Sequence, residues 1–135
     1  MSVLIDTSAF IAIGDKLDNY HSKAMKAWMD LVQSDEEILA TNYTVVETIA
    51  LLQRRAGKQA IAHFIDVVLP VVTVIWVDSS LHNTALISFI NYGGGKNAPS
   101  LVDCISLEIL KRKSIQKALV YDRHFAECGA TLLGQ

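Results

Sequence analysis

The sequence predicts an α/β protein with three layers, in which helices cover both faces of a central parallel sheet of about five strands. Short runs of aliphatic and β-branched residues alternate with longer stretches whose apolar residues recur at helical spacing. The chain has 135 residues, of which 51% are apolar and 19% charged. That length and composition predict one globular domain over residues 1–135, without internal repeats.

The strands are expected where short apolar runs occur between polar segments. Residues 3–5 are three consecutive aliphatic residues, which is typical of a strand buried on both faces. The run at 71–77 is rich in β-branched residues, and the last run lies at a sheet edge. The expected strands are residues 3–5, 38–41, 71–77, 118–121 and 130–133.

The helices are expected from apolar residues at spacings of three and four. In residues 42–55, Val45, Ile49 and Leu52 fall on one face, and Gly57 follows the last turn. Pro70 stops the next helix. The glycines at 93–95 do not match a phosphate-binding loop and predict a flexible connection. The expected helices are residues 9–13, 20–32, 42–55, 58–69, 81–92 and 100–113.

Charge and cysteine content restrict the classes of function. A net charge of −2 argues against a broad basic surface for nucleic acid, although a local basic rim is compatible with it. Cys104 and Cys128 have neither the number nor the spacing of a zinc site and are expected to be reduced thiols. No targeting segment is visible, and the most apolar stretch, residues 67–77, is too short for a bilayer. We therefore expect a cytoplasmic protein without membrane contact.

Four acidic residues occupy equivalent places along the chain. Asp6 and Asp122 each end a predicted strand, whereas Glu47 and Asp103 lie in the first turns of helices. In a right-handed βαβ fold, strand ends and the starts of the following helices meet at one edge of the sheet. The four carboxylates are therefore expected to converge.

Each acid also has a purely structural interpretation. Asp6 and Asp122 favour helix N-termini, and both Thr44–Glu47 and Ser100–Asp103 fit a capping box. Four such positions on one edge favour a shared cause, because clustered carboxylates repel one another unless a cation balances them. Mg²⁺ prefers oxygen ligands, and the lack of His or Cys among the four disfavours zinc.

These segments resemble the PIN domain, especially the small ribonucleases of the VapC toxin type. The resemblance covers nearly the whole chain. It rests on residues 4–8, 42–47, 100–103 and 121–125, which include an Asp-x-x-Phe element at Asp122 and Phe125. One departure is Val120, where the family often has Thr or Ser, so a hydroxyl that would orient a water at the fourth acid is missing.

The resemblance implies a Mg²⁺- or Mn²⁺-dependent endoribonuclease. The expected catalytic residues are Asp6, Glu47, Asp103 and Asp122, with the metal held by Asp6, Asp103 and Asp122. Divalent ions activate the water, shield the phosphate and assist the leaving oxygen in phosphodiester hydrolysis. Glu47 would complete the metal site or position the water. Ser8 is expected to bond a water or phosphate, and the candidate phosphate contacts are Lys96, Arg123 and His124.

Family resemblance further implies an RNA substrate, a homodimer and a small antitoxin as possible partners. The main alternative is an inactive PIN-like module that binds RNA or a protein partner. Retention of all four acids disfavours it, and a metal-dependent ribonuclease assay with an Asp6→Asn control separates the two. A haloacid-dehalogenase-type phosphatase requires a second aspartate two residues after the first, where this chain has Ser8.

Overall fold

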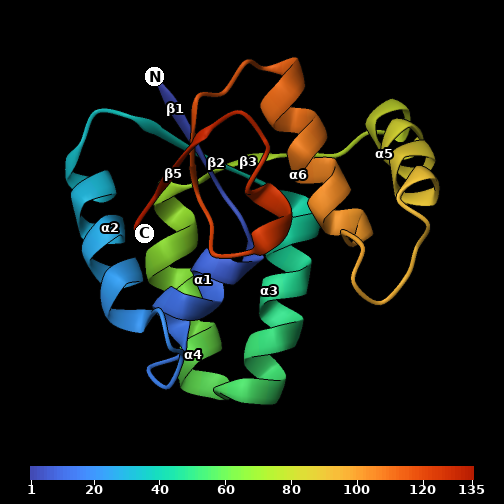
Figure 1. Cartoon of the computed structure of the whole chain (residues 1–135). Helices are drawn as coiled ribbons and strands as arrows, with labels where there is room; N and C mark the ends of the chain where they lie inside the picture. Colours follow the sequence, from blue (N-terminus) through green and yellow to red (C-terminus); the bar gives the residue numbers. More distant parts are fainter.

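Five parallel strands form one sheet in the order β3-β2-β1-β4-β5 in a computed structural model that describes all 135 residues (Figure 1). β1 is central and pairs with β2 on one side and β4 on the other, with Leu4 opposite both Leu39 and Ala118. The strands are β1 (Ser2–Ile5), β2 (Glu37–Thr41), β3 (Thr73–Ile75), β4 (Lys117–Leu119) and β5 (Thr131–Leu133).

Six α-helices cover the sheet, which confirms the three-layer prediction. One face packs against α1, α2, α3 and α4, and the other packs against α5 and α6. In Figure 1, α2 and α5 lie at opposite flanks of the molecule. The helices are α1 (Thr7–Gly14), α2 (His21–Gln33), α3 (Asn42–Arg55), α4 (Lys58–His63), α5 (Ser79–Asn91) and α6 (Leu101–Arg112).

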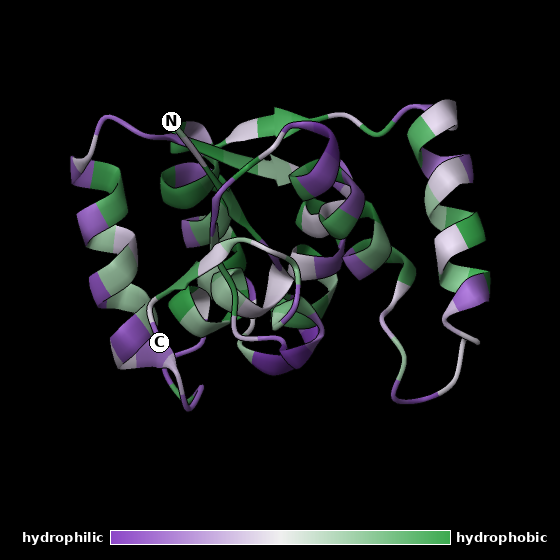
Figure 2. Cartoon of the chain, turned by 45° about the horizontal axis from the view of Figure 1, so that its top comes forward, coloured by the Kyte–Doolittle hydropathy of each residue, from purple (hydrophilic) through white to green (hydrophobic).

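The central strand is buried on both faces because its side chains alternate between two apolar clusters. Val3 and Ile5 belong to the cluster beneath α1, whereas Leu4 packs with the residues of α6, and all three are fully buried. Figure 2 shows the sheet largely green, with purple positions on the outer turns of the helices. The strand that ends at Asp6 is therefore held rigidly from both sides.

The main differences from the predicted elements concern one helix and two strands. The helix expected at 58–69 is broken: α4 ends at His63, a π-helical segment follows over Phe64–Val68, and a 3-10 turn that contains Pro70 covers Leu69–Val71. β3 is consequently shorter than the strand expected at 71–77. β4 ends at Leu119, earlier than predicted, because the N–H of Tyr121 donates to Ser8 Oγ instead of extending the ladder.

None of the helices combines the length and the apolar composition that crossing a lipid bilayer requires.

Candidate active site

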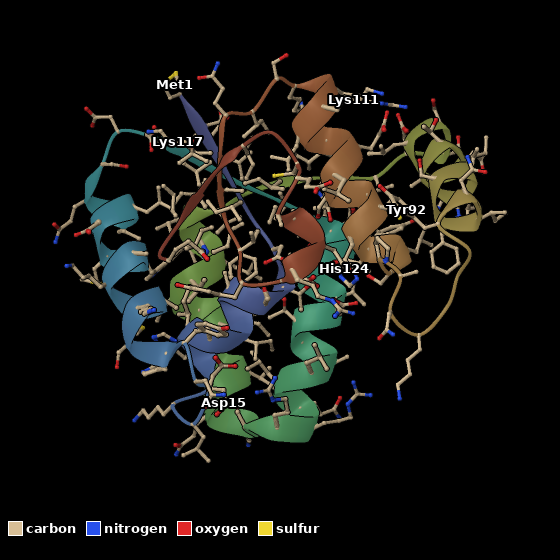
Figure 3. All side chains as sticks on the ribbon, in the orientation of Figure 1. Met1, Asp15, Tyr92, Lys111, Lys117 and His124 are labelled. Atoms are coloured by element: carbon tan, nitrogen blue, oxygen red, sulfur yellow. The ribbon has the colours of Figure 1, made fainter.

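The four predicted acids line one cleft of about 300 Å³ at the carboxyl edge of the sheet. Figure 3 shows His124 beside this end of α6, whereas Met1 and Lys117 lie at the opposite edge. The lining residues are Asp6, Thr7, Ser8, Ile11, Asp18, Tyr20, Glu47, Leu51, Arg55, Asp103, Tyr121 and Asp122. The strand ends and helix starts thus converge as expected for a parallel sheet.

Asp6 forms the buried end of the cleft and is only 3% exposed. It is the N-cap of α1, and its Oδ1 accepts hydrogen bonds from Ser8 Oγ at 2.7 Å and from the Ala9 N–H at 3.4 Å. Ser8 Oγ in turn accepts from the Tyr121 N–H at 2.8 Å, which ties α1 to the segment after β4. Asp6 therefore combines a capping role with a fixed position facing the cleft.

Glu47 reaches the cleft from the second turn of α3. The helix begins at Asn42, and the Thr41 side chain caps it by accepting from the Thr44 N–H at 3.1 Å. The Thr44–Glu47 capping box is therefore a wrong prediction, because the true cap lies three residues earlier. Glu47 is left with no capping bond and faces the other acids as a half-buried side chain.

Asp103 and Asp122 form the more exposed end of the cleft together with His124. The predicted capping box at Asp103 is confirmed: its Oδ2 accepts from the Ser100 N–H at 3.0 Å, and its own N–H donates to Ser100 Oγ at 3.1 Å. Asp122 caps the 3-10 turn Arg123–Phe125. Candidate ligand atoms of Asp103, Asp122 and His124 all lie within 4.8 Å of one another.

His124 is held between the acids and the loop before α6. Its Nδ1 lies 2.6 Å from Asp122 Oδ1 and 3.7 Å from Asp103 Oδ2, and its Nε2 donates to the Asn97 carbonyl at 2.8 Å. The Asn97 carbonyl is the main cause that raises the pKa of His124, and the two aspartates raise it further. The imidazole is thereby favoured in its cationic form beside two carboxylates.

Burial and mutual repulsion raise the pKa of Asp6, Glu47 and Asp103. Burial raises the pKa of Asp6 to about 7, against the opposing bonds from Ser8 and Ala9 and in concert with the charges of Asp103 and Asp122. Burial likewise raises the pKa of Glu47 and of Asp103. The charged forms of these groups are therefore poorly compensated by the protein alone.

The donor set fits a hard divalent cation. The converging groups are mainly carboxylate oxygens, the ligands that Mg²⁺ and Mn²⁺ prefer. Thr7 adds a buried hydroxyl that lies near enough to Glu47 to oppose the rise of its pKa, yet no protein atom stands in hydrogen-bonding geometry to Thr7 Oγ1. A buried oxygen without a partner in a carboxylate-lined cleft is what a hydrated cation would satisfy.

The remaining predicted residues lie in different surroundings. Both the proton and one lone pair of Ser8 Oγ are engaged with protein atoms, so Ser8 fixes Asp6 in position. Lys96 and Arg123 are exposed, and neither lines the cleft. Lys96 lies on the loop whose Asn97 carbonyl contacts His124.

A second group of residues lines the cleft and was not predicted: Asp18, Tyr20, Arg55 and Tyr121. Arg55 forms ion pairs with Asp15 and Asp18, each at 3.3 Å, and the rings of Tyr20 and Tyr121 stack. They meet because α1 has only eight residues, about 12 Å, so the loop after it returns beside α3. The only signal in the sequence is that Tyr121 precedes Asp122.

Comparison with known proteins gives one family and several relatives. A family model described as the PIN domain matches residues 3–130. The chain is 28% identical over 128 residues to the 23S rRNA-specific endonuclease VapC20 of Mycobacterium tuberculosis, which covers 94% of both chains. It also matches the crystal structure of M. tuberculosis VapC20, described as a Sarcin-Ricin loop cleaving toxin, with a TM-score of 0.82 over 96% of each chain.

Two more distant structures share the fold. The structure of FitAcB from Neisseria gonorrhoeae matches with a TM-score of 0.64 at 14% identity, over 98% of this chain and 96% of that one. The structure of PAE2754 from Pyrobaculum aerophilum matches with a TM-score of 0.62 at 20% identity, over 98% and 92%. At these identities the likeness concerns the arrangement of the sheet and helices alone.

Proposed function

This chain belongs to the PIN domain family, and from that premise we propose that it is a Mg²⁺- or Mn²⁺-dependent endoribonuclease. The observation that carries the proposal is the convergence of Asp6, Glu47, Asp103 and Asp122 on one cleft. The relation to VapC20, a 23S rRNA-specific endonuclease, supports RNA as the substrate class and a toxin of a toxin–antitoxin pair as its biological role.

We assign the metal site to Asp6, Asp103 and Asp122. When bound, the cation supplies positive charge for the phosphate and lowers the pKa of the attacking water. Asp6 is held by Ser8, and Asp103 is held by the backbone of Ser100, so both carboxylates are positioned before a cation arrives. Such prior positioning lowers the reorganisation needed for catalysis.

Glu47 orients the attacking water and accepts its proton. The raised pKa of Glu47 makes its carboxylate a stronger base toward the proton of the water. As the water oxygen bonds to phosphorus, the bond from phosphorus to the leaving ribose oxygen breaks, and that oxygen takes a proton from the solvent. Arg55 is the cationic side chain among the lining residues. Its Nη2 pairs with Asp15 and Asp18, which leaves the rest of the half-exposed guanidinium to a neighbouring phosphate.

The experiment is a ribonuclease assay on single-stranded and structured RNA with Mg²⁺, Mn²⁺ or EDTA. Cleavage is expected with either cation, and EDTA should abolish it. Asp6→Asn should be inactive, whereas Asp35→Asn, which changes an exposed loop aspartate, should retain activity. If the pure protein binds RNA but cleaves none under any condition, the alternative of an inactive RNA-binding module is correct.

We further propose that the protein is cytoplasmic and pairs with a small antitoxin.

We also propose that it forms a homodimer. Large apolar side chains exposed on α3 and α5 supply a surface for another chain: Val46, Ile87 and Ile90 are 67%, 64% and 70% exposed. A mass equal to one chain at all concentrations in light scattering would refute the homodimer.

A further inference from the structure

An exposed aromatic ring stands beside the catalytic acids without a role in the chemistry proposed above. Tyr20 lines the same cleft as Asp6, Asp103 and Asp122 and is 45% exposed. One side of its ring lies on Tyr121, with ring centroids 4.6 Å apart and planes inclined by 14°. Nearly half of Tyr20 remains exposed, so its ring offers an apolar surface in a cleft lined by charged residues.

Tyr121, which backs this ring, is fixed at both ends. Its hydroxyl donates to the Gly134 carbonyl at 3.0 Å, and its N–H donates to Ser8 Oγ at 2.8 Å. Ser8 also holds Asp6, so the stacked pair and the buried acid share one hydrogen-bonded frame. The distance from the ring to the catalytic carboxylates is therefore set by the fold.

The loop that carries Tyr20 is fixed as well. The Tyr20 N–H donates to Asp18 Oδ1 at 2.9 Å, and Asp18 Oδ2 accepts from Arg55 at 3.3 Å. Arg55 also pairs with Asp15, which anchors the loop to the end of α3. Tyr20 thus presents its ring without any need for a ligand to order it, which lowers the entropy lost on binding.

An aromatic ring beside a guanidinium in one cleft matches the chemistry of single-stranded nucleic acid. Bases stack on aromatic side chains, and cationic side chains follow the backbone. No hydrogen bond to the protein engages the Tyr20 hydroxyl, so the ring is held by its stacking on Tyr121 and by the backbone of its loop. An arrangement that served only to cover Tyr121 would not require the ring to share a cleft with the acids.

We propose that Tyr20 is a base platform. The nucleobase next to the scissile phosphate stacks on the side of the Tyr20 ring away from Tyr121, and Arg55 binds the adjoining phosphate. RNA is favoured over a peptide as the occupant because the ring shares its cleft with the acids proposed to act on a phosphodiester. This inference rests on the proposed function and extends it to substrate recognition.

The test measures stacking directly. Short single-stranded RNAs in which 2-aminopurine replaces adenine are titrated with the Asp6→Asn protein, in which cleavage is blocked. Stacking on Tyr20 should quench the fluorescence of 2-aminopurine. Adding Tyr20→Leu should abolish the quenching and weaken binding about 5- to 150-fold, the equivalent of about 1–3 kcal/mol per stacked base. Tyr20→Phe should retain both.

A matched control and a kinetic readout separate binding from structure. Tyr92→Leu, which removes another exposed tyrosine (55% exposed) after α5, should change neither quenching nor affinity. In the otherwise wild-type enzyme, Tyr20→Leu should raise KM far more than it lowers kcat. Unchanged quenching in the Tyr20→Leu protein, or a lower melting temperature with unchanged RNA affinity, would overturn the platform. If the wild type cleaves no RNA, the proposed function fails. The 2-aminopurine titrations still show whether a base stacks on Tyr20.

Discussion

The two ends of the acidic cleft hold their carboxylates by different means. Asp6 is buried at the end of the central strand and is fixed by hydrogen bonds from its own α1 segment. Asp103 and Asp122 are partly exposed at the starts of helical segments, and His124 lies between them. A basic side chain therefore contacts the carboxylates at the exposed end, whereas the hydrogen bonds to Asp6 come from neutral groups.

This difference determines where an added cation matters most. The charge of a carboxylate that is partly exposed and lies beside a basic side chain is partly compensated without metal, whereas a buried carboxylate depends on protonation or on a bound cation. The pKa of about 7 at Asp6 reflects that condition. We therefore expect both ends to be required for activity, the exposed end to have little effect on folding, and the buried end to couple folding to pH and metal most strongly.

The largest expected effect is that of Asp103→Asn on activity. Asparagine retains the oxygen that accepts from the Ser100 N–H, so the cap and the fold should persist. It lacks the negative charge that a metal ligand must carry, so cleavage should fall on the order of 1,000-fold or more. Single-turnover cleavage under saturating Mg²⁺ measures this. A wild-type rate would show that Asp103 is only a capping residue.

The same substitution also tests the electrostatics of the exposed end. Burial raises the pKa of Asp103, which means that its charged form destabilises the metal-free fold. In EDTA near neutral pH, Asp103→Asn should therefore melt at the wild-type temperature or slightly above it. A clear loss of stability there would mean that the carboxylate stabilises the fold, contrary to our assignment.

A smaller effect, on stability, concerns the buried end. Asp6 has a pKa of about 7 in the fold and 3.8 as its ordinary value, so between these values the folded state binds more protons than the unfolded state. The free energy of unfolding without metal should then fall as pH rises through that window, by up to about 4 kcal/mol. The raised pKa values of Glu47, Asp103 and His124 act with the same sign.

Denaturant unfolding in EDTA between pH 4.0 and about 8 measures this slope. Asp6→Asn should make the dependence of unfolding free energy on pH shallower, and Asp35→Asn should leave it unchanged. Saturating Mg²⁺ should stabilise the wild type more at the upper end of the range, because the cation binds the deprotonated site and only the folded state. Identical curves with and without Mg²⁺ at pH 8 would refute cation binding at the cleft.

The site residues differ in how well the sequence predicts them. Asp6 and Asp103 were recognisable because a strand end and a capping box are local signals, each contained in a few consecutive residues. Glu47 was placed on the correct helix, but its cap was misassigned because Thr41 and Thr44 are equivalent in sequence and only the end of β2 selects Thr41. The residue types at strand ends and helix starts could be predicted from the sequence. Which of two nearby threonines caps the helix could not.

The rest of the cleft depends on distances that no local pattern contains. Tyr20 and Arg55 are 35 positions apart, and they meet only through the short α1 and the ion pairs of the loop that follows it. The early end of β4 has a similar origin, since Ser8, far away in sequence, takes the Tyr121 N–H. The fold class was predictable from alternation, whereas these contacts required the packed structure.

The smallest expected effect is that of Ser100→Ala, which separates the positioning of Asp103 from its charge. The change removes the bond from the Asp103 N–H to Ser100 Oγ but keeps the backbone N–H that holds Asp103 Oδ2. The loss of one N-cap bond should cost about 1 kcal/mol of unfolding free energy. Because the carboxylate and the backbone N–H that holds it are intact, cleavage should fall by no more than about tenfold, the lower end of the loss for a change around a metal ligand. Denaturant unfolding and the cleavage assay are run on the same preparation. A rate as low as that of Asp103→Asn would mean that the cap, and not the charge, is what the exposed end of the cleft requires.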